Sequence, residues 1–250
     1  MVSLKSITTF FYINAFLVSL SAFTYITRTF FISQLISNTS LMVFIHYGTV
    51  HKKRIHVSQK NYTLKDYLYL LSSTLLQSIT ESIVQHHCKS SHGTIYFLFY
   101  LFVFELLLDL FHYTAHRTLH TFPILYPIHK THHHYAQPQL LNTYYHSPID
   151  LVLVDCLPTM ISMYILKGVF SSFQIQMVLV YKSFIEISGH SGKYVAPSSC
   201  FPLCVWLPRI LGIELYTEDH DYHHSGNCKC NYSKRFKLWD RVFGTFKDIR

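Results

Sequence analysis

Residues 94–120 read TIYFLFYLFVFELLLDLFHYTAHRTLH, an apolar run that ends in closely spaced histidines. A helix needs about 20 predominantly apolar residues to cross the hydrocarbon core of a bilayer, and residues 94–111 approach that length. His112 and His116 follow directly and are four residues apart, a spacing that puts both side chains on one face of a helix. The stretch therefore predicts a transmembrane helix that carries a pair of imidazoles to the membrane surface.

Five further apolar runs predict that most of the chain is helical and embedded in the membrane. They cover residues 7–25, 30–45, 64–83, 149–165 and 169–187. The second run is the weakest, because Gln34, Asn38 and Ser40 interrupt it. The first has neither a basic n-region nor a small-residue cleavage site, so we expect it to be retained as a span. We expect an all-α integral membrane helical bundle of about four to six spans with a cytosolic, His-rich helical cap. The alternative is a soluble all-α protein whose apolar runs are buried core helices.

The charged residues are few and unevenly placed. They make up 14% of the 250 residues, half of the residues are hydrophobic, and the formal net charge is +8. Because the lysines and arginines lie between apolar runs, they indicate membrane topology and argue against a nucleic-acid partner. Residues 51–60 and the segment after 189 are basic, and even numbers of expected spans separate them from the His-rich segment 112–148. The positive-inside rule then predicts that all three lie on the cytosolic face.

Histidine is the most unusual feature of the composition, with 18 copies. Three clusters have helical spacing, in which positions i, i+3 and i+4 share one face, so each can present two or three imidazoles to one metal. Imidazole binds iron, zinc, copper and nickel, and the eight candidate ligands exceed the four that close a structural zinc site, which favours two metals. The clustered residues are His112, His116, His129, His132, His133, His220, His223 and His224.

Two neighbouring residues are expected to support these ligands without binding metal. Asp109 and His120 fall on the helix face of His112 and His116, and we expect Asp109 to hold a ligand imidazole in one tautomer through a hydrogen bond. The alternative is that Asp109 is a snorkelling polar residue or one satisfied by other partners. The six cysteines are dispersed and include no C-x-x-C pair. We therefore expect free thiols in a reducing compartment, and neither a disulfide framework nor a zinc ribbon.

The order of the clusters, H-x3-H, H-x2-H-H and H-x2-H-H between apolar runs, resembles the fatty acid hydroxylase / sterol desaturase superfamily of membrane non-haem diiron oxidases. The likeness covers residues 94–247 and includes GHSG at 189–192 and the ending NYSKRFKLWDRVFGTF. It implies a catalytic domain over residues 94–250, preceded by membrane-anchoring spans in residues 1–93. The motifs are specific for the superfamily and do not identify the substrate.

The resemblance implies that the eight clustered histidines bind two iron ions, which zinc could replace in a purified sample. It adds His190 as a ninth ligand and His146 as a candidate tenth, although HSPID differs from the family's His-Pro pairing by an inserted serine. The implied enzyme uses O2 to hydroxylate or desaturate a sterol, fatty acyl or sphingoid lipid. Electrons would come from cytochrome b5 and its reductase or from a ferredoxin, and in a eukaryote the location would be the endoplasmic reticulum.

A non-redox membrane zinc protein, either a transporter or a hydrolase, is the alternative function. A transporter should place histidines or acids in the middle of its spans, whereas the clusters here lie at span ends or in loops. The H-E-x-x-H signature of zinc peptidases is absent, because HYTAH has no glutamate after its first histidine. The sequence therefore favours the oxidase.

Overall fold

The computed structural model describes residues 4–27, 29–56, 61–195, 206–226 and 229–249, and these residues form helices joined by loops, with no strands. The long helices are α1 (Leu4–Thr27), α2 (Phe30–Gly48), α3 (Leu64–His87), α4 (Phe97–Thr121) and α8 (Ser172–Gly189). A further continuous helical segment consists of α6 (Pro148–Leu151), η3 (Val152–Cys156) and α7 (Leu157–Ile165). The short elements are α5 (Tyr126–His129), η1 (His132–His134), η2 (Leu140–Tyr144), α9 (Trp206–Ile210), α10 (Thr217–Ser225) and α11 (Leu238–Val242). The predicted all-α fold is confirmed.

Local sequence signals explain where two of the long helices begin. The backbone N–H of Thr63 donates to Asp66 Oδ2 at 2.6 Å, which closes a capping box at the start of α3. Ser171 and Gln174 form the same reciprocal arrangement at the start of α8. These boxes satisfy N–H groups that have no partner within a helix, and they fix the first turn of each element.

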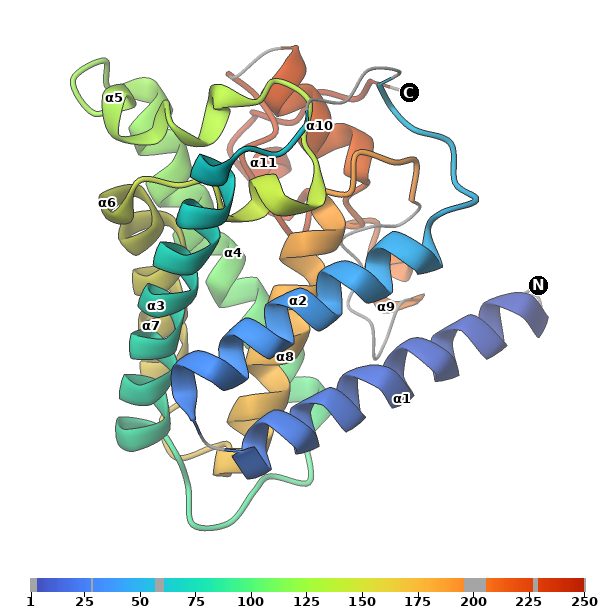
Figure 1. Ribbon diagram of the computed structural model, residues 1–250, viewed down its shortest axis with the longest axis vertical. Helices are drawn as coiled ribbons and strands as arrows, with labels where there is room; N and C mark the ends of the chain where they lie inside the picture. The colour runs from blue at the N-terminus through green and yellow to red at the C-terminus, as the bar shows by residue number, and fades with distance from the viewer. Residues whose placement is uncertain (1–3, 28, 57–60, 196–205, 227–228, 250) are drawn as a thin grey trace.

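The long helices pack side by side and bring the histidine-bearing elements to one end of the molecule (Figure 1). One hydrophobic core lies among α3, α4, α7 and α8 and includes the fully buried Phe104. A second core lies among α1, α2, α8 and η2 and includes Leu17 and Tyr181. The C-terminal end of α4, the short elements α5 and η1, and α10 all lie at the same end of this bundle (Figure 1).

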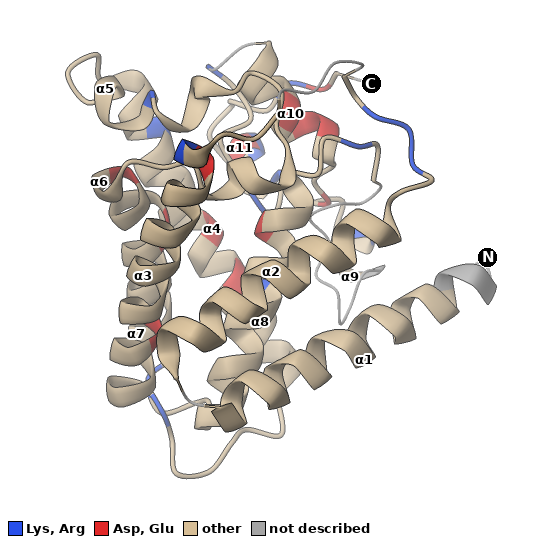
Figure 2. Cartoon of the chain, viewed as in Figure 1, with Lys and Arg blue, Asp and Glu red and all other residues tan. Residues whose placement is uncertain are grey.

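Three helical segments are long and apolar enough to cross a membrane: Ile7–Thr27, Phe97–Thr121 and Pro148–Ile165. Their outward faces are apolar, as at Phe11 and Phe99, which expose 65% and 62% of their surface. The segments α2, α3 and α8 are helical as expected but lie outside this set, so the count of four to six spans stays a prediction. Figure 2 shows most charged residues at the histidine-bearing end, with a few inside the bundle.

The cysteines that the structure describes are not joined by disulfides, as expected. Cys88, Cys156 and Cys230 are buried and form no disulfide. Cys200, Cys204 and Cys228 lie outside the described residues, so the expectation for them stays a prediction.

Candidate metal centre

Four chain segments bring histidines together at one end of the bundle (Figure 1). Helix α4 runs without interruption from its apolar part to Thr121, so His112, His116 and His120 lie on one face at four-residue intervals. The other segments are α5 with η1, α10, and the residue that ends α8, His190. The ligand candidates therefore come from elements far apart in the sequence.

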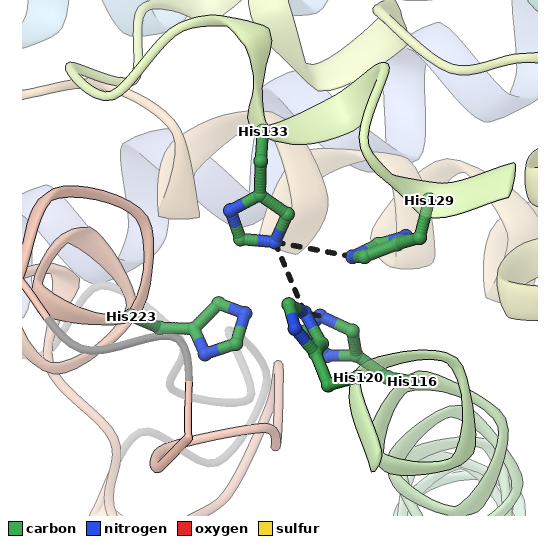
Figure 3. A group of neighbouring side chains, drawn as sticks. All are labelled: His116, His120, His129, His133 and His223. Carbon is green, nitrogen blue, oxygen red and sulfur yellow. Dashed lines mark hydrogen bonds between the residues drawn. The ribbon is translucent and has the colours of Figure 1, made fainter. Parts of the chain in front are cut away.

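The first group of histidines converges from α4, α5, η1 and α10. It comprises His116, His120, His129, His133 and His223, and one ring nitrogen of each lies within 4.8 Å of the others (Figure 3). Nε2 of His133 is 3.1 Å from Nε2 of His120 and 3.2 Å from Nε2 of His129. Nε2 of His116 is 3.2 Å from Nε2 of His120. Such a spacing of nitrogens leaves room at their centre for a small cation.

The second group lies beside the first and is completely buried. It comprises His132, His190, His220 and His224, again with one ligand nitrogen each within 4.8 Å of the others. Nε2 of His190 and Nε2 of His220 are 3.2 Å apart. The rings of His132 in this group and His133 in the first group have centroids 5.7 Å apart. Two metal positions can therefore be neighbours.

Backbone carbonyls determine the tautomer of four of these histidines. A carbonyl oxygen can only accept a hydrogen bond, so each Nδ1 facing one carries the proton and the opposite Nε2 carries a lone pair. The pairs are His112 with Val154 (2.7 Å), His116 with Tyr232 (2.8 Å), His190 with Glu186 (3.0 Å) and His223 with Cys230 (2.8 Å). Their Nε2 atoms are in the state that a metal requires.

Several other ring nitrogens are buried without any hydrogen-bond partner. An unpaired buried polar atom costs free energy, so an unusual number of them in one place indicates an interaction with a further group. These atoms are Nε2 of His112 and His223, Nδ1 of His132 and His220, and both ring nitrogens of His224. Neutral imidazoles with convergent lone pairs and no other partner fit a pair of transition-metal ions.

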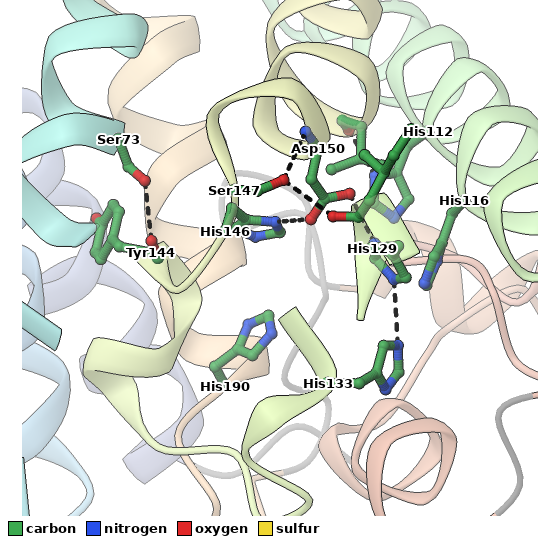
Figure 4. Close-up of polar contacts among 12 residues, drawn as sticks. Ser73, His112, His116, His129, His133, Tyr144, His146, Ser147, Asp150 and His190 are labelled. Atoms are coloured by element: carbon green, nitrogen blue, oxygen red, sulfur yellow. Dashed lines mark hydrogen bonds and ion pairs between the residues drawn. The ribbon is translucent and has the colours of Figure 1, made fainter. Parts of the chain in front are cut away.

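The carboxylate of Asp150, which belongs to neither group, connects the two groups. Asp150 accepts a hydrogen bond from Nδ1 of His129 at 2.7 Å and another from Nδ1 of His146 at 2.6 Å (Figure 4). His146 in turn stacks on His132, with ring centroids 4.0 Å apart. Ser147 accepts from the backbone N–H of Asp150 at 3.2 Å and so holds the start of α6. Asp150 thus orients His129 of the first group directly. It also orients His146, whose ring packs against His132 of the second group.

Comparison with known proteins identifies the family. A model of the fatty acid hydroxylase family matches residues 99–245, which is more than half of the chain. The chain belongs to the fatty acid hydroxylase family. The expected resemblance is therefore confirmed, over nearly the range that the motifs indicated. No solved structure matches the chain significantly.

Curated relatives with different names are similar to more than half of this chain. The chain is 33% identical over 157 residues to the fatty acid hydroxylase vlmA of Lecanicillium sp, covering 60% of this chain and 42% of that protein. It is 33% identical over 150 residues to methylsterol monooxygenase erg25B of Aspergillus fumigatus, covering 59% and 48%. It is 31% identical over 163 residues to a very-long-chain aldehyde decarbonylase of Oryza sativa subsp. indica, covering 60% and 52%. The chain spans about half the length of these curated relatives.

Most of the histidines that the sequence predicts to be metal ligands lie in the two groups. The eight that do are His116, His129, His132, His133, His190, His220, His223 and His224. His112 and His146 lie next to the groups, with ring centroids 5.1 Å from His116 and 4.0 Å from His132, respectively. His120, expected only to support the ligands, lies within the first group. Metal binding by these residues stays a prediction.

The hydrogen bond expected between Asp109 and a ligand imidazole is corrected by the structure. Asp109 is fully buried, and its two oxygens accept the backbone N–H groups of Lys234, Arg235 and Phe236 at 2.9, 3.0 and 3.1 Å. The reason is that the C-terminal loop, and not an imidazole, packs against this part of α4. Asp150 has the role that was assigned to Asp109. Its signal in the sequence is its position four residues after His146.

Burial keeps the imidazoles of His190 and His223 neutral. Desolvation lowers the pKa of His223 to about 3, because the surrounding protein disfavours the imidazolium. It also lowers the pKa of His190 to about 3, with a further contribution from the nearby Lys234. At physiological pH both rings are therefore neutral, with the proton on Nδ1 and a lone pair on Nε2, as metal ligands must be.

Proposed function

We propose that this chain is a membrane-bound, O2-dependent diiron oxidase that hydroxylates or desaturates a lipid at an unactivated C–H bond. The observation that carries the proposal is the pair of adjacent imidazole groups, which contain nine histidines, seven of them buried, and no carboxylate. Bound iron would supply the activation of O2 that such a bond requires. The names of the relatives, a fatty acid hydroxylase and a methylsterol monooxygenase, support a lipid substrate of the fatty acyl, sterol or sphingoid class.

The protein's own contribution is to hold the imidazoles of the two groups and the adjacent His112 in fixed positions. Val154, Tyr232, Glu186 and Cys230 accept Nδ1 protons through backbone carbonyls, which directs each Nε2 inward. Asp150 does the same for His129 through a carboxylate, which makes that imidazole a stronger electron donor. The second group is buried and His120 and His133 of the first group are partly exposed, so the protein shields most of the site from water, which limits side reactions.

The position of the site suits a substrate that enters from the bilayer. His112, His116 and His120 lie in the last turns of an apolar helix, so an acyl chain or sterol beside α4 can approach the histidines while its polar end stays at the interface. We propose that this end faces the cytosol and that the membrane is the endoplasmic reticulum in a eukaryote. The exposed basic residues Lys52, Lys53 and Arg54 lie at this end and support the orientation.

Electrons are proposed to come from a separate protein. The sequence contains no dinucleotide fingerprint, and the reduction of O2 needs externally supplied electrons. Cytochrome b5 with its reductase, or a ferredoxin, is the class of donor that fits a cytosolic face.

The decisive experiment measures metal content and lipid oxidation together. We expect the purified protein to hold about two iron ions and to consume O2 when reductant and a membrane lipid extract are present. His223→Ala removes a ligand of the first group and His132→Ala a ligand of the second, so each should lose metal and lipid oxidation. His134→Ala is the matched control, because His134 is adjacent in the sequence and belongs to neither group. Full activity of both ligand variants would exclude the proposal, and zinc that supports hydrolysis without O2 uptake would favour the zinc protein.

A further inference from the structure

Five charged side chains form a buried ionic network inside the helical bundle, next to the histidine-bearing end. They are Glu105 on α4, Asp155 in η3, Lys182 and Glu186 on α8, and Arg235 in the loop between α10 and α11. Nε of Arg235 lies 3.0 Å from Glu105 Oε2, and its Nη2 lies 2.7 Å from Glu186 Oε1. Nζ of Lys182 lies 3.0 Å from Glu186 Oε1 and also contacts Asp155. Each of the five exposes 6% or less of its surface.

Stability alone is a weak explanation for this network. Moving charges out of water costs several kcal/mol per ion, and well-packed apolar residues often replace a buried ion pair without loss of stability. Ionisable residues inside a membrane protein are rare and commonly have a functional role. Arg235 also joins its own loop to α4 and α8. Its guanidinium bridges Glu105 of α4 and Glu186 of α8, and its backbone N–H donates to Asp109 of α4 at 3.0 Å.

The network is directly connected to the groups that orient two histidines. Glu186 is a member of the network through its carboxylate, and its backbone carbonyl accepts the Nδ1 proton of His190 at 3.0 Å. Asp155 is a member, and the carbonyl of the preceding residue, Val154, accepts the Nδ1 proton of His112 at 2.7 Å. A shift of η3 against α4 would therefore change the direction of the His112 imidazole. A shift of α8 would displace the His190 imidazole together with its acceptor.

A third connection runs through the C-terminal loop. Tyr232, three residues before Arg235, accepts the Nδ1 proton of His116 at 2.8 Å through its carbonyl. The N–H of Tyr232 is held by Asp240 at 2.9 Å, so this part of the loop is fixed at both ends, by Asp240 and by Arg235. The three carbonyls lie on three different elements, and Lys182 and Arg235 are the cations that fasten these elements to one another.

We propose that Lys182 and Arg235 are positioning residues of the metal centre: by pairing with Asp155, Glu186 and Glu105 they set the relative placement of α4, η3 and α8, and so the direction of the His112, His116 and His190 imidazoles. The inference rests on the proposed metal binding and is independent of the lipid substrate. The network fixes geometry between helices, which the hydrogen bonds within each helix leave free.

Glu186→Gln is the most selective variant, because it keeps the side-chain shape and the backbone carbonyl. Each cation also retains one carboxylate, Asp155 for Lys182 and Glu105 for Arg235, so we expect the protein to fold. Loss of a residue that orients a ligand typically weakens metal affinity by about 10–100-fold, and we expect at least about tenfold faster loss of metal to a chelator. Glu81→Gln is the matched control, since Glu81 is a buried carboxylate on α3 with no ion pair to the network among the described residues.

Three further variants separate positioning from folding. Asp155→Asn combined with Lys182→Met removes the Lys182–Asp155 pair as a unit together with the contact of Lys182 to Glu186, which keeps its pair with Arg235. The thermal unfolding of the metal-free protein should therefore stay close to that of the wild type while metal loss accelerates. Arg235→Lys should retain more metal than Arg235→Met, but less than the wild type, because one ammonium cannot bridge two helices as a guanidinium does.

The outcomes separate this inference from the proposed function. Faster metal loss at unchanged metal-free stability supports it, even if the wild-type protein binds metal and oxidises no lipid. Wild-type metal retention in Glu186→Gln and in the double variant overturns it, and the proposed oxidase then stands. A wild-type protein that binds no transition metal overturns both.

Discussion

Nδ1 of His129 lies 2.7 Å from Oδ1 of Asp150, and both side chains are almost completely buried. The other carboxylate oxygen holds His146, whose ring stacks on His132 of the second histidine group. One acidic side chain thus connects a histidine of each group, in a centre where no carboxylate belongs to the groups themselves.

Asp150→Asn should weaken metal binding without unfolding the protein. An amide cannot accept the Nδ1 protons of two histidines with two oxygens, so His129 or His146 loses its partner. We expect metal affinity to fall by about 10–100-fold, measured by competition with a chelator. Asp221→Asn is the matched control, because Asp221 pairs at 2.7 Å with His56, which belongs to neither group. Equal metal affinity in the two variants would contradict the role of Asp150.

His120→Ala should reduce metal content as strongly as His116→Ala does. The Nε2 atoms of these two residues are 3.2 Å apart, and His120 approaches His133 as closely. Metal analysis of the two variants side by side, with His134→Ala as the reference, measures the effect. If His120→Ala retained all its metal while His116→Ala lost it, His120 would only support the ligands.

Gly192→Ala should destabilise the protein more than Gly168→Ala. Both glycines have positive φ, at 64° and 81°, so alanine at either position costs about 1–2 kcal/mol in backbone strain. At Gly192 the added Cβ would also lie 2.5 Å from the carbonyl oxygen of Pro138, whereas at Gly168 nothing lies within 4 Å. Thermal unfolding in detergent should therefore rank Gly192→Ala below Gly168→Ala, with Gly48→Ala close to the wild type. Equal unfolding temperatures for the first two would refute the steric argument.

Glycosylation should report the orientation of the chain in a eukaryotic membrane. The sequence Asn61-Tyr-Thr63 is an acceptor site beside the basic loop, and we expect it to remain unmodified because the proposed topology puts it on the cytosolic face. A flexible acceptor tag inserted between Lys89 and His92, at the opposite end of α3, should be modified. Gel mobility before and after endoglycosidase treatment distinguishes the two. Modification at Asn61 would reverse the proposed topology.

The apolar runs predict most of the helices of the bundle. Where the prediction is weakest, buried polar side chains interrupt the apolar run. Residues 30–45 were the weakest predicted span because Gln34 and Asn38 interrupt them, yet α2 forms there. The side-chain amide of Asn38 is fully buried and donates to Gln77 of α3 at 3.1 Å. A hydrogen bond between two helices thus satisfies a polar side chain that the pattern of one helix alone would predict to face water.

The sequence by itself determined the helical class, the family and the eight clustered histidines, because helical spacing and apolar length are local properties. Only the tertiary structure decided how these histidines divide into two groups, that His120 enters the first, and that Asp150 rather than Asp109 orients the imidazoles. Those relationships depend on where η3, α10 and the C-terminal loop lie against α4. Contacts between segments more than 100 residues apart, such as His116 with Tyr232, have no counterpart in the spacing of residues along the chain.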